Sequence, residues 1–168
     1  GTLSVQKAGT GSGTVTGPGI DCGSDCSERL HGAIALTATP DGNSEFSSWS
    51  TGATENPMTI SVYDDVTVTA TFGARRTLSV QKSGDGSGTV AGGGISCGSS
   101  CSSAVSDGTS LTLTATPAVG YKFTGWTGDV AEPQNASTTV LINGDKEIRA
   151  NFALLDRSIL KQRFHCSR

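Results

Sequence analysis

Cysteine thiols are the side chains of this chain whose spacing could support chemistry. Cys22 and Cys26 are separated by three residues, Cys97 and Cys101 repeat that spacing, and Cys166 has no counterpart. Such pairs can form disulfides, act as redox couples or hold a metal. Redox couples normally use Cys-x-x-Cys at the start of a helix, whereas a Gly/Ser-rich loop surrounds both pairs here, and a shared zinc site would need the pairs to converge. We therefore expect two local disulfides, which indicate an oxidising compartment.

Two tryptophans are the candidates for a ligand platform. Trp49 follows Phe46 by three residues, and Trp126 follows Phe123 by three. An exposed indole can stack on a sugar ring; alternatively, each Trp caps its own small core and its N–H reaches a backbone carbonyl. In a regular strand this odd spacing sends the two rings to opposite faces. Either a bulge brings them together or one ring lies outside the core.

Acidic and histidine side chains give weaker signals. The acidic loop residues that could supply oxygens to calcium are Asp21, Asp25, Asp41 and Glu45. Their spacing matches neither an EF-hand nor a calcium-binding nonapeptide repeat. Serine replaces Asp21 and Asp25 in the second copy of the loop, which argues against a duplicated acid/base pair. His31 and His165 stand alone, so we expect no metal, no cofactor and no catalytic activity.

The elements that position these residues form one unit written twice. The segment Thr2–Lys7 recurs unchanged as Thr77–Lys82, 75 residues later, and the cysteine loop recurs with it. Each unit is small enough that a covalent staple adds useful stability. The repeat predicts one β domain at residues 2–73, a second at 77–153 and a basic C-terminal tail at 154–168.

Alternation of apolar and polar residues predicts strands in both units. Leu3 and Val5 fall on one face of the first segment, and Ile34, Leu36 and Ala38 fall on one face of a later one, as in half-buried strands. We count about six short strands per unit and no convincing helix. The sequence therefore predicts an all-β fold of two tandem small antiparallel β domains, each with a local disulfide.

Short turns join these strands. Alternate glycines in Gly9–Gly13 predict a hairpin, and Tyr63–Asp65 and Asn143–Gly144 predict a closing hairpin in each unit, since Asn-Gly is a strong hairpin signal. The Gly-x-Gly-x-Gly loop precedes another strand and not a helix, so it is not a nucleotide-binding fingerprint.

Four motifs occur in this order in both units: Leu-Ser-Val-x-Lys-x-Gly-x-Gly-x-Gly-Thr-Val, Gly-Ile-x-Cys-Gly-x-x-Cys, Leu-Thr-Ala-Thr-Pro and Phe-x-x-Trp-[Ser/Thr]. A fifth, Val-Thr-Ala-Thr-Phe, ends the first unit. With them the chain resembles the divergent internalin B-repeat family, short β-rich modules found in tandem in bacterial exported and cell-surface proteins. The resemblance covers residues 2–73 and 77–153, although the second unit keeps only the apolar pattern of the last motif. It implies noncatalytic surface architecture, sandwich-like or β-grasp-like, and brings no active-site residues.

The net charge limits the classes of partner that the chain could bind. Lys and Arg number 12 and Asp and Glu 15, for a net charge of −3, which gives no basic field for nucleic acid. The sequence contains no run of about 18 apolar residues, so it predicts no membrane-spanning helix. Expected oxidised cysteines and the family resemblance together predict a secreted or cell-surface location, with self-association or neighbouring domains of a surface assembly as partners.

The tail at 154–168 breaks the composition of everything before it, because it is basic, aliphatic and nearly free of glycine. It permits a short helix, the first strand of a truncated third unit, a disordered end or a frameshift remnant. Cys166 could form a bond between chains, and a free strand could dock on a neighbour's open sheet edge.

Two functional hypotheses follow from these patterns. The first is a noncatalytic extracellular structural or spacer module of a bacterial surface protein or filament, acting through self-association or display. The alternative is a carbohydrate- or protein-binding adhesion module anchored by Trp49 and Trp126. Exposure of the indole rings separates them, since an open aromatic strip favours binding and buried indoles beside open edge strands favour assembly.

Overall fold

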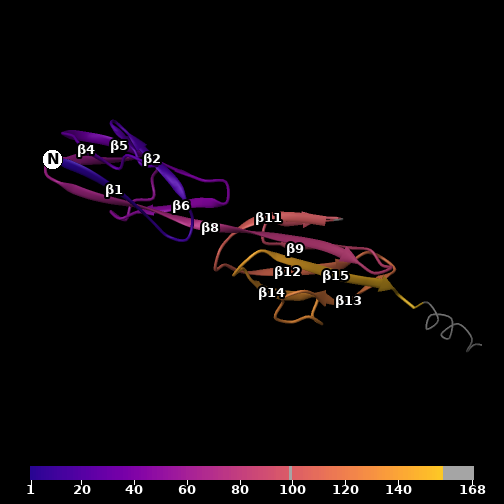
Figure 1. Ribbon diagram of the computed structural model, residues 1–168. Helices are drawn as coiled ribbons and strands as arrows, with labels where there is room; N and C mark the ends of the chain where they lie inside the picture. Colours follow the sequence, from indigo (N-terminus) through magenta and orange to yellow (C-terminus); the bar gives the residue numbers. More distant parts are fainter. Residues whose placement is uncertain (99, 157–168) are drawn as a thin grey trace, which may run out of the picture. The chain divides into compact units, whose positions relative to one another are not determined.

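The computed structural model describes residues 1–98 and 100–156, and every regular element within them is a β-strand (Figure 1). The chain divides into two compact units, Gly1–Arg76 and a second that begins at Thr77. No helix in the described part is long and apolar enough to cross a membrane. Predictions about most of the tail, including His165 and Cys166, fall outside the described residues.

The first unit, described throughout, is built from eight strands in two sheets. One sheet has the order β6-β8-β1-β4 and the other the order β3-β2-β5-β7. The strands are β1 Thr2–Ala8, β2 Gly13–Gly17, β3 Ile20–Asp21, β4 Ser27–Arg29, β5 Gly32–Pro40, β6 Ser44–Trp49, β7 Met58–Val62 and the first part of β8, Val66–Ser83.

The second unit repeats this strand order in its described residues. One sheet contains β13-β15-β8 with β11 also paired to β8, and the other has the order β10-β9-β12-β14. Besides the last part of β8, the strands are β9 Gly88–Gly92, β10 Ile95–Cys97, β11 Ser100–Ser106, β12 Ser110–Pro117, β13 Tyr121–Thr127, β14 Ser137–Leu141 and β15 Lys146–Leu154.

Each unit encloses its own core between its two sheets. Along β5, Ile34, Leu36 and Ala38 are buried and the residues between them are exposed, as the alternation predicts. These side chains meet Leu3 and Phe72 from the other sheet in one cluster. The all-β prediction is confirmed, and the arrangement of each unit is a sandwich of two sheets.

The first and last strands of each unit pair in parallel. Strand β1 pairs with β8 from Leu3↔Val66 to Ala8↔Thr71. Strand β15 pairs with β8 from Lys146↔Leu78 to Asn151↔Ser83. Local alternation predicts strands but not which distant strands become neighbours, so the sequence did not reveal this pairing.

The hairpins predicted at three turns are wrong. Strands β1 and β2, joined by the glycine loop, lie in different sheets, and so do β7 and β8 and also β14 and β15. The turn residues do reverse the chain, but the chain crosses from one sheet to the other instead of pairing with itself. A turn signal specifies the change of direction and not the sheet to which the next strand adds.

Candidate functional site

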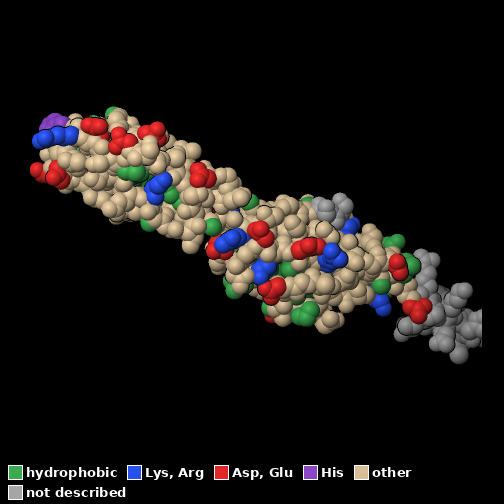
Figure 2. Space-filling model, in the orientation of Figure 1, with side chains coloured by type: hydrophobic (Ala, Val, Ile, Leu, Met, Phe, Trp, Pro, Cys, Tyr) green, Lys and Arg blue, Asp and Glu red, His purple; other side chains and the backbone are tan. Residues whose placement is uncertain are grey.

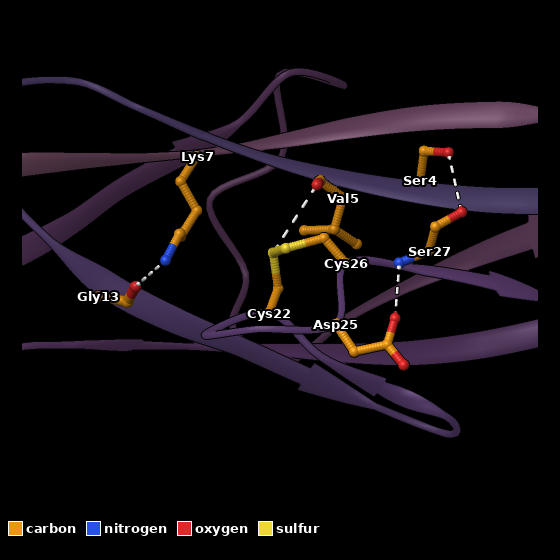
Figure 3. The surroundings of a disulfide bond; sticks show 8 residues. All are labelled: Ser4, Val5, Lys7, Gly13, Cys22, Asp25, Cys26 and Ser27. Carbon is orange, nitrogen blue, oxygen red and sulfur yellow. Dashed lines mark hydrogen bonds between the residues drawn. A yellow bond between two sulfur atoms is a disulfide. The ribbon is translucent and has the colours of Figure 1, made fainter.

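The predicted Cys22–Cys26 disulfide is present, with a Cα–Cα distance of 4.3 Å (Figure 3). The amide of Cys22 donates to the carbonyl of Val15 in one sheet, at 2.8 Å, and the carbonyl of Cys26 accepts from the amide of Val5 in the other, at 2.7 Å. The Cys22 side chain is only 1% exposed and its Sγ lies 3.8 Å from the Val5 carbonyl oxygen. This bond therefore links the two sheets inside the core, which is a structural role.

The corresponding pair in the second unit is only partly described. Cys101 is half-buried and packs against the second core, whereas the side chain of Cys97 lies outside the described part of the chain. The Cys97–Cys101 disulfide stays a prediction, as does any bond made by Cys166.

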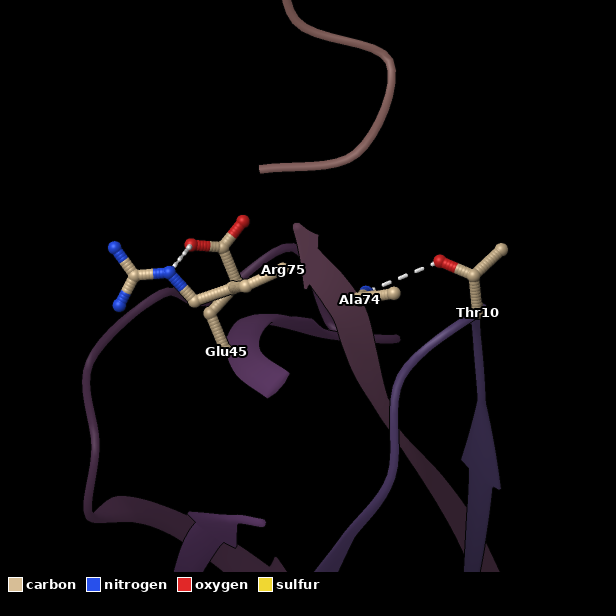
Figure 4. A network of polar contacts seen from close by, with 4 residues as sticks. All are labelled: Thr10, Glu45, Ala74 and Arg75. Atoms are coloured by element: carbon tan, nitrogen blue, oxygen red, sulfur yellow. Dashed lines mark hydrogen bonds and ion pairs between the residues drawn. The ribbon is translucent and has the colours of Figure 1, made fainter. Parts of the chain in front are cut away.

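Among the acidic candidates, the side chains of Asp25 and Glu45 make local contacts. Asp21 and Asp25 exchange backbone hydrogen bonds of 3.0 and 2.8 Å, and Oδ1 of Asp25 accepts from the Ser27 amide at 3.5 Å. Glu45 lies 3.8 Å from the Nε atom of Arg75, beside the bond from the Ala74 amide to a threonine hydroxyl (Figure 4). Among the described residues, no three His, Cys, Asp or Glu side chains gather in a metal-binding group.

A β-bulge brings the paired aromatic rings together. The register of β6 shifts between Phe46 and Ser48, and that of β13 shifts between Phe123 and Gly125. The Phe46 and Trp49 ring centroids are consequently 5.1 Å apart, and the equivalent separation in the second unit is 5.3 Å. Of the two arrangements that the spacing permits, the bulge is the one present.

Both indoles are buried. Trp49 is 1% exposed and Trp126 is 5% exposed. The Trp49 indole N–H donates to the carbonyl of Glu55 at 2.9 Å, and that of Trp126 donates to the carbonyl of Asn135 at 2.8 Å. Neither ring offers a face to a sugar in this arrangement, which argues against the candidate ligand platform at Trp49 and Trp126. Each Trp caps its own core, as the alternative interpretation holds.

The glycine loop has its polar groups engaged internally. The Lys7 ammonium donates to the carbonyl of Gly13 at 3.1 Å, and the Gly11 amide donates to the carbonyl of Phe72 at 2.9 Å. Gly9 has a φ of +100°, and a Cβ there would overlap the same Phe72 carbonyl. The hollow that Lys7, Gly9 and Phe72 help to line measures only about 150 Å³. These contacts hold the loop between β1 and β2 against the core of the first unit.

Two aspartates have a role that sequence reasoning missed. The Thr2 amide donates to Asp65 at 2.7 Å, and the Thr77 amide donates to Asp145 at 2.8 Å. This hydrogen bond is the main cause that holds the pKa of Asp65 below its usual value. Recurrence of an aspartate at the same place in both units, just before the last strand, was the signal that could have revealed it.

Two copies of one fold, with matching bulges, buried indoles and glycine loops, account for nearly all described residues. The divergent InlB B-repeat domain family matches residues 3–76 and again residues 78–155. The chain belongs to this family. Motifs shared by the two B-repeats thus contribute residues to each core and to each bulge.

Known proteins add little to the family assignment of these B-repeats. No curated protein matches the chain. Similar solved structures include a bacterial adhesin from Mobiluncus mulieris, with 14% identity and a TM-score of 0.39, where the alignment covers 75% of this chain and 60% of that one. The major pilin T-13 from Streptococcus pyogenes has 12% identity, a TM-score of 0.35, and coverage of 92% and 97%. The pilus adhesin SpaC from Lactobacillus rhamnosus GG has 10% identity and a TM-score of 0.35, and the alignment covers 92% of this chain and 31% of that one.

These TM-scores lie below 0.5, so the three structures carry no conclusion about this chain. The two B-repeats span 60% of the length of the Mobiluncus adhesin.

Proposed function

We propose that this chain is a noncatalytic, tension-bearing spacer of an extracellular bacterial surface protein or filament. The observation that supports this function most directly is the parallel pairing of the first and last strands in each unit. The family assignment, with two B-repeats in tandem over residues 3–155, fits a role based on shape.

Parallel terminal strands resist extension because of their direction. A force on the two ends of the first unit pulls β1 toward its N-terminus and β8 toward its C-terminus, so the strands slide against each other. The six registered residue pairs from Leu3↔Val66 to Ala8↔Thr71 then share the load and must separate together. Strands that are pulled apart from one end lose their hydrogen bonds one at a time, which requires less force.

Covalent and surface features fit service outside the cell. The Cys22–Cys26 disulfide forms in oxidising compartments and joins the two sheets of the first unit. On the face drawn in Figure 2, charged side chains are scattered among uncharged polar and backbone atoms. We accordingly propose an extracellular location and partners within a surface assembly, including other copies of the chain.

Single-molecule force measurements test this function. Handles at Gly1 and Arg76 load the β1–β8 pairing of the first unit in sliding geometry. Handles at Gly1 and Tyr63, an exposed residue just before β8, load the same pairing from one end. We expect the first geometry to require several-fold more force. Equal unfolding forces in the two geometries would rule out a tension-bearing role.

A further inference from the structure

In the second unit a loop closes the outer edge of β14. The amide of Ala131 donates to the carbonyl of Thr139 at 3.0 Å, and Glu132 Oε2 accepts from the Thr139 amide at 3.3 Å. Val130, from the same loop, packs against the second core. An edge strand with free backbone groups can pair with a strand of another chain. This loop prevents such pairing at Thr139 because it hydrogen-bonds the backbone groups of that residue.

The closing loop is the segment that distinguishes the two units. The Trp49 amide donates to the carbonyl of Ala53, and the Trp126 amide donates to the carbonyl of Pro133, which fixes the equivalent positions. Three residues, 50–52, separate the first pair, and six residues, 127–132, separate the second. The three additional residues of the second unit thus belong to the loop that closes its edge.

The equivalent edge of the first unit, strand β7, is open: among the described residues, β5 is the strand that pairs with it, on one side. Ala38 exchanges two hydrogen bonds with the side chain of Asn56, of 2.9 and 2.6 Å, so its backbone groups point toward the β7 side of β5. Backbone groups alternate in direction along a strand, so those of Ala33 and Ala35 point away from β7. The register places Thr59 opposite Ala35 and Ser61 opposite Ala33. The backbone groups of Thr59 and Ser61 therefore point away from the sheet.

A hollow of about 460 Å³ lies beside this open edge. It is lined by Thr51, Ala53, Glu55 and Pro57–Ile60, where the three additional residues of the closing loop would fall. Ala53 and Ile60 are only partly buried against the first core. The first unit thus presents an edge strand beside a hollow of mixed polar and apolar lining, whereas the second unit places its longer loop along the equivalent strand.

The charges around β7 select the occupant. Glu55 precedes the strand and Asp64 and Asp65 follow it, and no Lys or Arg lines the hollow. Antiparallel pairing of two β7 strands about Ile60 would place Glu55 of each copy opposite Asp65 of the other, and like charges in opposition are unfavourable. A basic extended segment suits the edge better than a second β7.

The chain itself carries such a segment. Four of its 12 Lys and Arg residues and none of its 15 Asp and Glu residues fall within 157–168, which leaves eight basic and 15 acidic residues in 1–156. Residues 157–163 read Arg-Ser-Ile-Leu-Lys-Gln-Arg, with two aliphatic residues between basic ones. The aliphatic residues of this segment suit the apolar part of the hollow, formed by Ala53, Pro57, Met58 and Ile60, and its basic residues suit the acidic flanks of β7.

We propose that the open edge of β7 binds residues 157–163 of a second copy of this chain by strand addition. Backbone groups of Thr59 and Ser61 hydrogen-bond the added segment, one of its aliphatic side chains enters the hollow, and its basic side chains lie near Glu55 and Asp64. This inference rests on the proposed assembly function and names its contact. It gives the first unit the receiving edge, while the second unit, closed by its own loop, does not receive a strand there.

Self-association of the full chain tests the proposal. Cys166→Ser in every sample removes disulfide-linked dimers, and sedimentation velocity then measures association while hydrogen–deuterium exchange follows the Thr59 and Ser61 amides. We expect association to slow exchange at both amides by at least about tenfold. Grafting residues 127–132 in place of 50–52 closes the edge and should weaken association at least about tenfold. The association that remains should depend on salt concentration no more strongly than that of the parent chain.

Charge changes provide a test that does not depend on the graft folding. Lys161→Glu with Arg163→Glu should weaken association, and Glu55→Lys with Asp64→Lys should restore it. The matched control is Lys122→Glu on the exposed surface of β13, which should leave association unchanged. Association that survives reversal of the tail charges but not the graft means that another segment occupies the edge, and the assignment of residues 157–163 is then wrong.

The proposal fails if the full chain stays monomeric and the Thr59 and Ser61 amides exchange at the same rate at every concentration. That result leaves the spacer function standing, because force resistance is measured on single molecules. Equal unfolding forces in the two pulling geometries, by contrast, overturn the spacer function. Strand addition is then tested separately by hydrogen–deuterium exchange at Thr59 and Ser61.

Discussion

The amide nitrogen of Thr2 lies 2.7 Å from Oδ1 of Asp65, and this hydrogen bond ties the start of β1 to the turn that precedes β8. The N-terminal ammonium and Arg29 add smaller attractions to the same carboxylate. All of these interactions favour the charged form, so the pKa of Asp65 is lower in the folded chain than in the unfolded one. The contact sits at the end of the parallel pair on which the proposed function depends.

Asp65→Asn should lower the stability of the first unit at pH 7. A carboxyl group whose pKa falls on folding stabilises the fold above its unfolded pKa, about 3.9, and this contribution is lost as the pH falls through the folded pKa. The difference in Tm between the parent and the variant should therefore be present at neutral pH and shrink as the pH falls below the unfolded pKa and through the folded one. Asp64→Asn, one residue earlier, is the control. A difference that stays constant with pH would mean that charge is not the cause.

Trp49→Ala should destabilise the first unit by about 3–5 kcal/mol, because it removes a buried indole and leaves the Glu55 carbonyl without its donor. Denaturant unfolding monitored by circular dichroism measures the loss. Tyr63→Ala removes an aromatic ring that is 63% exposed and should change stability by less than about 0.5 kcal/mol. Similar losses in the two variants would contradict the core assignment.

Local patterns predicted the strands well because burial follows the period of two. The inward positions of Ile34, Leu36 and Ala38 were predicted correctly from this period. The shortest strands, β3 and β4, were missed because two or three residues cannot display alternation. They flank the cysteine loop, and their presence explains why each unit has more strands than the sequence suggested.

Relationships between distant residues were not legible. Leu3 pairs with Val66 across more than sixty residues, and no local pattern records that choice. The Phe46–Trp49 bulge was one of two possibilities, and in it the Phe46 ring contacts both the Trp49 ring and the ring of Phe72 in the distant strand β8. The open edge at Thr59 depends on which loop hydrogen-bonds the neighbouring edge strand, and the sequence shows only that the two loops after the tryptophans differ in length.

Replacing Cys22 and Cys26 together by serine should lower the stability of the first unit by about 2 kcal/mol, the amount that closing a five-residue loop contributes in the chain-entropy model. Mass spectrometry before and after reduction establishes the bond, and chemical unfolding gives the loss. Reductant added to the double variant should produce no further change in the first unit. A double variant as stable as the parent would mean that the hydrogen bonds from Cys22 and Cys26 to the two sheets suffice without the covalent link.

Gly13→Ala should destabilise the first unit by about 1–3 kcal/mol, because a Cβ at this buried position would overlap the ring of Phe72. Gly88→Ala should do the same in the second unit, where the added Cβ meets the ring of Phe152. Gly42→Ala is the matched control, since nothing lies within 4 Å of a Cβ there. Thermal unfolding of the three variants separates steric overlap from the general effect of removing a glycine. If all three shift Tm equally, close packing of the glycine loop on the terminal Phe does not explain why glycine occupies these positions.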